Sequence, residues 1–265
     1  MLPYQVKNTL TRMFFTGDFF EILSKIKNRM LYSNVDKISK ENERYLEEAQ
    51  SISGFIERID PVLARETKEK VEEIRKNGKE ILDKIDFDLG GGGAYDLLYF
   101  LIRYLKPAVV VETGVASGFS SYASLEALEA NKYGMLYSSD FPYFRLENPE
   151  QYIGVIVPKK LKENWKLYIK GDRQNLPSIS SQIKKIDIFH YDSDKSYNGR
   201  KYAMSSLADK FTQDSVIIMD DIQNNDFFFD YVRKNKIDDV FIFEFEGKYL
   251  GVWGGSNFMQ KLTEK

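Results

Sequence analysis

The sequence predicts an α/β fold, in which a doubly wound and mostly parallel sheet ends in an antiparallel hairpin and follows an N-terminal helical segment. Short apolar runs alternate with helical patterns from about residue 90 onward, which is typical of a parallel sheet covered by helices. Near the C-terminus, residues 240–245 and 249–253 flank Gly247 as the two strands of a hairpin would. We therefore expect a helical region at residues 1–89 and an α/β domain at residues 90–265.

The helical region shows one clear amphipathic pattern and no convincing strand. Its apolar positions recur at steps of three, four and seven, and Pro61 predicts a break before this helix: Val71, Ile74, Ile81, Leu82 and Ile85. An earlier apolar set predicts a surface that docks on the protein's own core, a partner subunit or a membrane face: Leu10, Met13, Phe14, Phe19, Phe20, Leu23 and Ile26. A homo-oligomer formed through the N-terminal helices is one form of such docking.

A run of four glycines, residues 90–93, predicts the junction between the two regions. It could be a plain linker or a hinge that closes over a ligand. The elements expected after it are helices at 95–105, 119–130 and 197–210, strands at 108–111, 135–139, 165–169, 186–191 and 215–219, and the hairpin.

Composition excludes several chemistries. The 265 residues include 38 Lys plus Arg and 40 Asp plus Glu, a net charge of −2, with no Cys and a single His, His190. A chain without Cys forms no disulfide, thiolate zinc site or iron–sulfur cluster, and one His rules out a multi-histidine metal site. The near-neutral charge argues against a nucleic-acid partner. No apolar run approaches a membrane span and the N-terminus lacks the apolar core of a signal peptide, so we expect a cytoplasmic location.

The most informative motif is the loop after the first predicted strand of the α/β domain. The strand ends in Glu112, and Gly114 and Gly118 follow it before the next helix. Glycines let the backbone approach a ligand closely at the carboxyl edge of a parallel sheet. The spacing Glu-x-Gly-x-x-x-Gly differs from the Gly-x-Gly-x-x-Gly fingerprint of dinucleotide sites, which favours a ligand without a pyrophosphate.

Acids also follow the next two predicted strands. Asp140 lies 26 residues after Gly114, and Asp172 with Arg173 follows the third strand. These acids could instead cap helices or turns.

A second acidic cluster follows the fourth and fifth predicted strands. Asp192 and Lys195 belong to the run Asp-Ser-Asp-Lys-Ser-Tyr, and Asp220 and Asp221 come after the next strand. Carboxylates converging at one sheet edge would suit a hard cation such as Mg²⁺. The alternatives are helix capping without a metal and, for Lys195, a simple salt bridge. His190 would be a hydrogen-bonded core residue, a base or a group near the metal.

The glycine loop with Asp140 and Asp172 resembles the class I S-adenosylmethionine-dependent methyltransferases, whose fold is Rossmann-like. The resemblance implies S-adenosyl-L-methionine as cofactor, with Asp140 accepting hydrogen bonds from its ribose. It also implies a set of cofactor-binding residues, which are Glu112, Gly114, Ala116, Gly118, Ser120, Asp140, Phe141, Asp172 and Arg173.

The acidic cluster narrows the resemblance to the metal-dependent O-methyltransferases, both the catechol and caffeoyl-CoA type and the broader group with cephalosporin-tailoring and sugar-modifying members. It implies metal ligands at Asp192, Asp220 and Asp221 and catalytic roles for Lys195, as a base, and Asp192. The catechol type usually has Asp-Asn where this chain has Asp220-Asp221. That departure puts a catechol-like substrate in doubt.

The resulting prediction is a methyltransferase, assisted by a divalent metal, that acts on a hydroxyl of a small molecule or sugar. Two alternatives stay open. The chain could be a non-catalytic binding or assembly subunit with the same fold, or an NAD-dependent oxidoreductase, which the glycine spacing disfavours.

Overall fold

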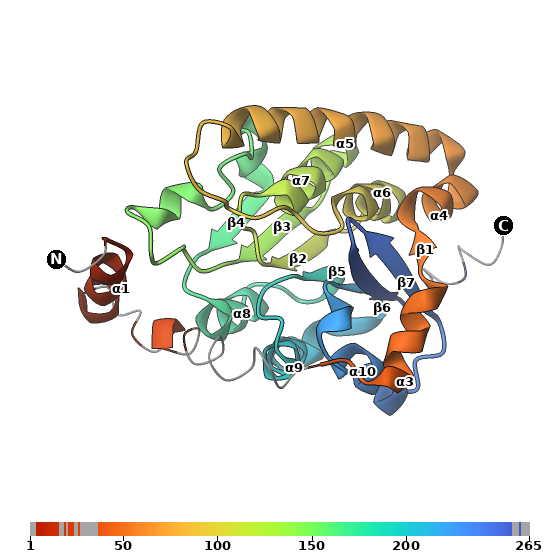
Figure 1. Ribbon diagram of the computed structural model, residues 1–265. Helices are drawn as coiled ribbons and strands as arrows, with labels where there is room; N and C mark the ends of the chain where they lie inside the picture. The colour runs from red at the N-terminus through yellow and green to blue at the C-terminus, as the bar shows by residue number, and fades with distance from the viewer. Residues whose placement is uncertain are drawn as a thin grey trace.

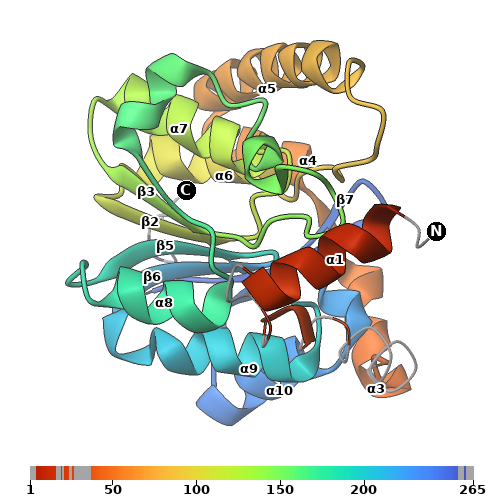
Figure 2. The same ribbon diagram turned by 90° about the vertical axis from the view of Figure 1, so that its left-hand side faces the viewer.

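The computed structural model describes residues 4–15, 19, 21–23, 26, 37–255 and 260. These residues form a three-layer sandwich with one sheet between two layers of helices (Figures 1 and 2). The strands of the sheet run in the order β1-β7-β8-β6-β5-β2-β3-β4. Their bounds are β1 Gln50–Ser51, β2 Val109–Thr113, β3 Met135–Ser139, β4 Trp165–Tyr168, β5 Ile186–Tyr191, β6 Phe211–Met219, β7 Val240–Phe245 and β8 Lys248–Trp253.

The sheet is parallel except for β8, which pairs antiparallel with both β6 and β7. Strand order reverses at β2, because the chain moves outward through β3 and β4 and then returns to pair β5 with the other side of β2. In such a sheet, ligands bind beyond the carboxyl ends of the strands at the point of reversal. The predicted fold class is confirmed, and the loops after β2 and β5 occupy this point.

Helices cover both faces of the sheet. One face carries α4 Ile52–Ile59, α5 Pro61–Leu82, α6 Tyr95–Leu105 and α7 Phe119–Asn131, and the other carries α8 Asp172–Ser180, α9 Tyr197–Ser206 and α10 Phe227–Asn235 (Figure 1). The remaining helices are α1 Tyr4–Phe15 and α3 Lys40–Glu43. Short 3-10 helices span Arg44–Glu48, Pro149–Tyr152, Lys159–Asn164, Ala208–Lys210 and Ile222–Asn224.

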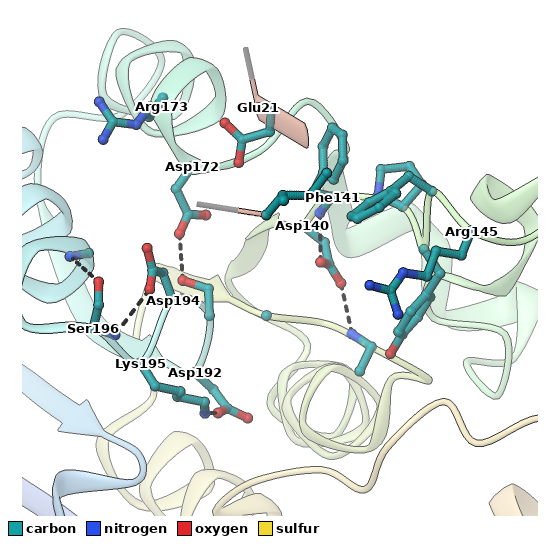
Figure 3. Close-up of a pocket in the computed structure, with 18 of the residues that line it drawn as sticks. Glu21, Asp140, Phe141, Arg145, Asp172, Arg173, Asp192, Asp194, Lys195 and Ser196 are labelled. Atoms are coloured by element: carbon teal, nitrogen blue, oxygen red, sulfur yellow. Dashed lines mark hydrogen bonds and ion pairs between the residues drawn. The ribbon is translucent and has the colours of Figure 1, made fainter. Parts of the chain in front are cut away.

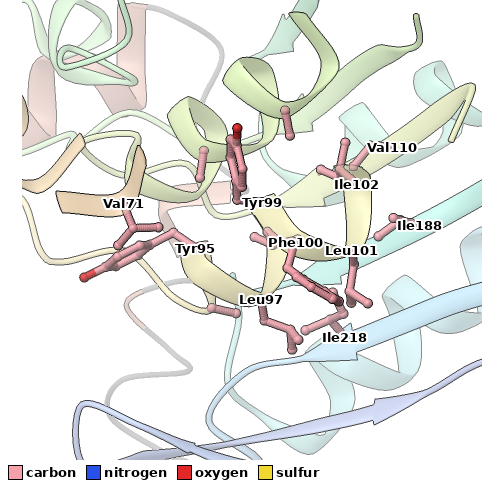
Figure 4. Packing of buried hydrophobic residues seen from close by; sticks show 14 of the residues in the cluster. Val71, Tyr95, Leu97, Tyr99, Phe100, Leu101, Ile102, Val110, Ile188 and Ile218 are labelled. Atoms are coloured by element: carbon pink, nitrogen blue, oxygen red, sulfur yellow. The ribbon is translucent and has the colours of Figure 1, made fainter. Parts of the chain in front are cut away.

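Two apolar clusters, one on each face, hold the layers together. Ile188 packs with α4 to α7, whereas Phe189 packs with α8 to α10, as expected from the two-residue period of a strand. Helix α6 lies at the centre of the first cluster, where Leu97, Phe100 and Leu101 are fully buried (Figure 4). This packing fixes the strand ends on which the candidate site stands.

The helical region differs from expectation in one element. Its predicted amphipathic helix is α5, which begins at Pro61 with the Asp60 carboxylate accepting from the amides of Val62 and Leu63. The prediction of no strand was wrong, since β1 pairs with β7 at the sheet edge. The strand has two residues and therefore no readable period. Helices α4 and α5 share an apolar cluster with α6 and α7, and the boundary at residue 89 stays a prediction.

Local pattern also missed α8 and α10. Helix α8 contains Pro177 and mostly polar residues, so its sequence does not favour a helix. No helix among the described residues is long and apolar enough to cross a membrane. Tyr4, Leu10 and Phe14 are exposed on or next to the apolar side predicted for α1, whereas Phe20 lies outside the described residues. Self-association through these helices stays a prediction.

Candidate functional site

A pocket of about 950 Å³ opens at the carboxyl edge of the sheet, where the strand order reverses (Figure 3). Eight of the predicted site residues line it: Gly114, Ala116, Asp140, Phe141, Asp172, Arg173, Asp192 and Lys195. The structure thus brings together the glycine loop after β2, the acids after β3 and β4, and the loop after β5. Pockets of this size hold small ligands.

Asp140 holds the glycine loop. Its Oδ2 accepts hydrogen bonds from the amides of Val115 and Ala116 at 3.0 and 2.8 Å, and its Oδ1 accepts from the amide of Phe141 at 2.6 Å. The amide of Gly114 donates to the carbonyl of Ser139 at 2.9 Å. Consecutive amides of this loop are therefore bonded within the protein.

Asp172 joins the loops after β4 and β5. Its Oδ1 accepts from the Ser139 hydroxyl at 2.6 Å, and its Oδ2 accepts from the Ser193 hydroxyl at 2.5 Å. The Asn175 amide group donates to the Ser139 hydroxyl at 2.9 Å. These bonds fix the Asp172 carboxylate in the pocket wall.

Gly114 lies directly against the loop after β5. It has a φ of +81°, and a Cβ at this position would collide with the backbone carbonyl of Asp192. A glycine is needed here for both reasons. The contact places the glycine loop beside the acidic loop.

Three predicted cofactor residues lie behind the pocket wall. Gly118, Ser120 and Glu112 are not among the residues that line the pocket. Glu112 is 1% exposed and accepts hydrogen bonds from three hydroxyls, those of Ser120, Ser121 and Ser138, at 2.5 to 2.8 Å. Burial raises the pKa of Glu112, but His190 and the hydroxyls outweigh it, so this pKa lies below its usual value. Direct cofactor contact by these three residues stays a prediction.

Lys195 forms ion pairs with two of the predicted metal ligands. Its Nζ contacts Asp192 Oδ1 and lies 2.7 Å from Asp221 Oδ2, as the salt-bridge alternative for this lysine predicted. Burial raises the pKa of Asp221, but the Lys195 ammonium outweighs it and lowers the pKa below its usual value.

The ligand atoms that converge differ from the predicted trio. Atoms of His190, Asp192 and Asp220 lie within 4.8 Å of one another, and Asp221 is not part of this group among the described residues. His190 and Asp220 are fully buried. Neither ring nitrogen of His190, nor Asp220 Oδ2, has a hydrogen-bond partner in the part of the chain that the structure describes.

Arg200 fixes the turn that carries Asp220 and Asp221. Its guanidinium is fully buried and donates to the carbonyls of both residues at 2.9 and 2.7 Å and to Asn225 Oδ1 at 3.1 Å. Burial lowers the pKa of Arg200. The sequence offered no sign of this role, because Arg200 reads as one polar residue near the start of a helix.

The N-terminal segment also contributes to the pocket, which the sequence did not predict. Gln5, Glu21 and Ile26 line it. Helix α1 reaches the loop after β3 through polar contacts, including Tyr4 Oη to Glu147 Oε2 at 2.8 Å and Arg12 Nη1 to Glu150 Oε1 at 2.6 Å. Figure 2 shows α1 lying across the open edge of the sheet.

Residues 111–222 match a family model described as a methyltransferase domain. No curated protein matches the chain. Similar solved structures include a methyltransferase of Geobacter sulfurreducens, with 16% identity over 69% of this chain and 90% of that chain and a TM-score of 0.51. An O-methyltransferase of Bacillus cereus in complex with SAH has 14% identity, coverage of 69% and 89% and a TM-score of 0.51. The O-methyltransferase TomG of Streptomyces achromogenes, involved in tomaymycin synthesis and in complex with SAM, has 15% identity, coverage of 69% and 89% and a TM-score of 0.50.

These similarities confirm the recognition made from the glycine loop. The segment of the α/β part that matches a methyltransferase domain begins in β2 and ends just after β6. The predicted enzyme class, a methyltransferase, is confirmed at this level. The solved structures share the fold.

Proposed function

We propose that this chain is an S-adenosylmethionine-dependent O-methyltransferase that methylates a hydroxyl of a small molecule or sugar with the help of a divalent metal. The observation that carries the proposal is the convergence of Gly114, Asp140 and Asp172 with Asp192 and Lys195 in one pocket. The family match over residues 111–222 and the O-methyltransferases that share the fold support it.

The charges in the pocket wall fit this cofactor. Among the described residues, six carboxylates line the pocket, namely those of Glu21, Asp88, Asp140, Asp172, Asp192 and Asp194, against three cationic side chains, Arg145, Arg173 and Lys195. S-adenosylmethionine carries a sulfonium and an ammonium group, which an excess of carboxylates stabilises. A pyrophosphate would be repelled by the same wall.

The loop amides support the same choice over a dinucleotide. Dinucleotide sites hold a pyrophosphate on unpaired amides of the glycine loop and the helix that follows. Here Asp140 already accepts from two of those amides, and the amide of Gly114 is bonded to Ser139. An NAD-dependent oxidoreductase is therefore the weaker alternative.

Bound S-adenosylmethionine supplies an electrophilic methyl group. Asp192 would accept the hydroxyl proton of the acceptor as the methyl group passes to its oxygen, and Lys195, which pairs with Asp192, could do so only in its neutral form. The residues of this chain orient the acceptor hydroxyl beside the cofactor, and such alignment can supply about 7–11 kcal/mol of the barrier reduction. Lys195 and Asp192 are the pocket residues best placed for this task.

The donor set also fits a divalent cation. Asp192 and Asp220 offer carboxylate oxygens, and Asp220 Oδ2 is buried without a hydrogen-bond partner among the described residues. A buried charge of this kind is costly unless a cation or donor compensates it. A cation held there would polarise the acceptor hydroxyl and lower its pKa.

Thermal stability with added ligands tests the proposal. We expect S-adenosylhomocysteine to raise the melting temperature and NAD to leave it unchanged, because only the first carries no pyrophosphate. Incubation with S-adenosylmethionine and a panel of sugars, phenols and polyketides, followed by mass spectrometry, would then identify a product 14 Da heavier, the mass of one CH₂. No shift with S-adenosylhomocysteine would leave the non-catalytic subunit as the better reading.

A further inference from the structure

We infer that His190 is the third protein ligand of the cation, together with Asp192 and Asp220, and that Glu112 orients its ring. The inference rests on the proposed function in so far as it assumes a cation at this site. It replaces Asp221 in the ligand set that the sequence implied. It also gives a role to the single histidine of the chain and to the buried acid at the end of β2.

Burial and missing partners point to a ligand at this position. His190 and Asp220 are both fully buried, and both ring nitrogens of His190 and the Oδ2 of Asp220 lack hydrogen-bond partners within the described residues. A histidine kept only for packing normally has at least one hydrogen bond, because an unpaired buried polar atom costs about 1–3 kcal/mol. Two such residues within 4.8 Å of each other and of Asp192 form a site that a cation would satisfy.

Strand register explains why these three residues converge and Asp221 does not. His190 pairs with Ile218 across β5 and β6, and Asp192 and Asp220 each lie two residues further along the chain. Side chains two residues apart on a strand share a face, so all three extend toward the α6 and α7 side. Asp221 comes one residue later, with a φ of +53°, and its carboxylate is held by Lys195 at 2.7 Å.

Glu112 is placed to orient the imidazole. It is the register partner of His190 across β2 and β5, and its Oε1 lies 3.9 Å from His190 Nδ1. Histidines that bind metals usually donate their second ring N–H to a carboxylate or carbonyl. With Nδ1 turned toward Glu112, Nε2 is the nitrogen left for the cation.

Gly93 leaves room for this cluster. A Cβ at Gly93 would collide with Asp220 Oδ2 and lie 3.1 Å from Asp192 Oδ2. Within the run of four glycines, Gly93 is therefore the position whose backbone lies against the carboxylates, whereas Gly92 lies against Phe119. The closeness of the carboxylates gives a physical reason for a glycine at position 93 besides flexibility.

The ligand set indicates which cation binds. Two ligand atoms on one octahedral Mg²⁺ ion lie about 3.0–4.2 Å apart, since each metal–oxygen bond is about 2.1 Å long. The observed separations of up to 4.8 Å therefore need only a small contraction. Carboxylates suit Mg²⁺ and Mn²⁺, whereas imidazole suits first-row transition metals. The mixed set favours Mn²⁺ or another first-row divalent ion over Mg²⁺.

The test measures Mn²⁺ binding to the full chain by isothermal titration calorimetry and by pulsed electron paramagnetic resonance. We expect the wild-type protein to bind Mn²⁺ more tightly than Mg²⁺ and to show the nitrogen coupling of one directly bound imidazole. His190→Leu should weaken Mn²⁺ binding at least about 100-fold, and Glu112→Gln about 10-fold or more, as outer partners of metal ligands typically contribute 10–100-fold. Asp221→Asn is the matched control and should bind Mn²⁺ with an affinity within about threefold of wild type.

Titration with S-adenosylhomocysteine in the same samples separates the possible failures. Equal Mn²⁺ affinity in wild type and His190→Leu, or loss of binding in Asp221→Asn alone, would overturn the inference and favour the carboxylate trio. Absence of nitrogen coupling would overturn it even if His190→Leu did not fold. A wild-type chain that binds S-adenosylhomocysteine but no Mn²⁺ would refute the metal site and leave the methyltransferase proposal standing. A chain that binds Mn²⁺ but not S-adenosylhomocysteine would refute the proposed function alone.

Discussion

The pocket has two sides that differ in how their polar atoms are bonded. The first side is formed by the loops after β2, β3 and β4, and the second by the ends of β5 and β6 with the loops that follow them. On the first side, Asp140 accepts from three backbone amides and Asp172 accepts from two hydroxyls. On the second side, His190 and Asp220 keep atoms without hydrogen-bond partners among the described residues.

The difference is in whether the polar atoms of each side are already hydrogen-bonded before a ligand binds. On the first side, the Asp140 and Asp172 carboxylates already accept hydrogen bonds from the protein itself, so this part of the pocket keeps its shape without a ligand. The second side is incomplete until something adds positive charge, because buried acceptors without donors are costly. Removing the charge of the unpartnered Asp220 should therefore change stability with the opposite sign to removing a carboxylate that is already hydrogen-bonded or paired, such as Asp140 or Asp221.

The largest change in stability is expected when Arg200 is replaced, because it holds the backbone turn at Asp220 and Asp221. Arg200→Met removes a buried guanidinium that donates to the carbonyls of Asp220 and Asp221, and it should lower the free energy of unfolding by about 4 kcal/mol. Urea unfolding measures this change. Arg65→Met, at an exposed position of α5, is the control and should cost less than about 1 kcal/mol. Similar losses in both variants would show that the acidic turn does not depend on Arg200.

The second largest effect is expected at Asp140, which holds the glycine loop on the first side of the pocket. Asp140→Ala leaves three loop amides without their acceptor and should lower the free energy of unfolding by about 3 kcal/mol, with loss of S-adenosylhomocysteine binding. Asp187→Ala is a matched control, because Asp187 Oδ2 accepts from the amides of Ala108 and Val109 at the opposite end of β2. It should cost stability but leave binding intact. If calorimetry shows equal loss of binding in both variants, the loop is not organised by Asp140.

The third largest effect is expected at Asp96, a carboxylate that does not line the pocket and whose charge should make the stability depend on pH. Burial raises the pKa of Asp96 to about 6, and its Oδ1 lacks a hydrogen-bond partner among the described residues. The folded protein then holds this proton more tightly than the unfolded chain, so this residue lowers stability as the pH rises from about 4 to about 6. Asp96→Asn should equal wild type at pH 4 and exceed its stability by about 2 kcal/mol at pH 8. The excess should be unaffected by Mn²⁺, and a variant that gains nothing at pH 8 would contradict the pKa.

The smallest effect is expected at Asp220 in the absence of the proposed cation. Asp220→Asn removes a buried charge and should raise the free energy of unfolding by about 1 kcal/mol in the presence of a chelator. Asp221→Asn should have the opposite sign, because its carboxylate pairs with Lys195 at 2.7 Å. Thermal unfolding with a chelator and with Mn²⁺ measures both. A destabilised Asp220→Asn protein under chelator would mean that Arg200 already compensates the charge, and the contrast between the two sides would fail.

The sequence predicted the framework well because buried parallel strands are short apolar runs. Strands β3 and β5 have the predicted bounds, and the loop acids follow them as expected. Helix α8 was missed because its stability comes from packing and from the Asn175 bonds, which local propensity does not contain.

The site was predicted in part for a similar reason. The family resemblance implied both Asp220 and Asp221 as metal ligands, and the role of Asp221 stays a prediction, since the two-residue period of a strand groups Asp220 with His190 and Asp192. The pocket contacts of Gln5 and Glu21 had no such signal, because they depend on long-range packing.

The contacts of α1 make access to the pocket depend on the surrounding electrolyte. Arg12 and Glu150 form an ion pair at 2.6 Å in which the Glu150 side chain is 44% exposed, and Tyr4 bonds Glu147 at the surface. A partly exposed pair of this kind, in which the Arg12 side chain is 14% exposed, is weakened at high ionic strength, whereas the apolar clusters on the two faces of the sheet are not. Rising salt should therefore weaken the contacts of α1 before it affects the sheet. The rate at which a ligand enters the pocket would then change while the folded core stays the same.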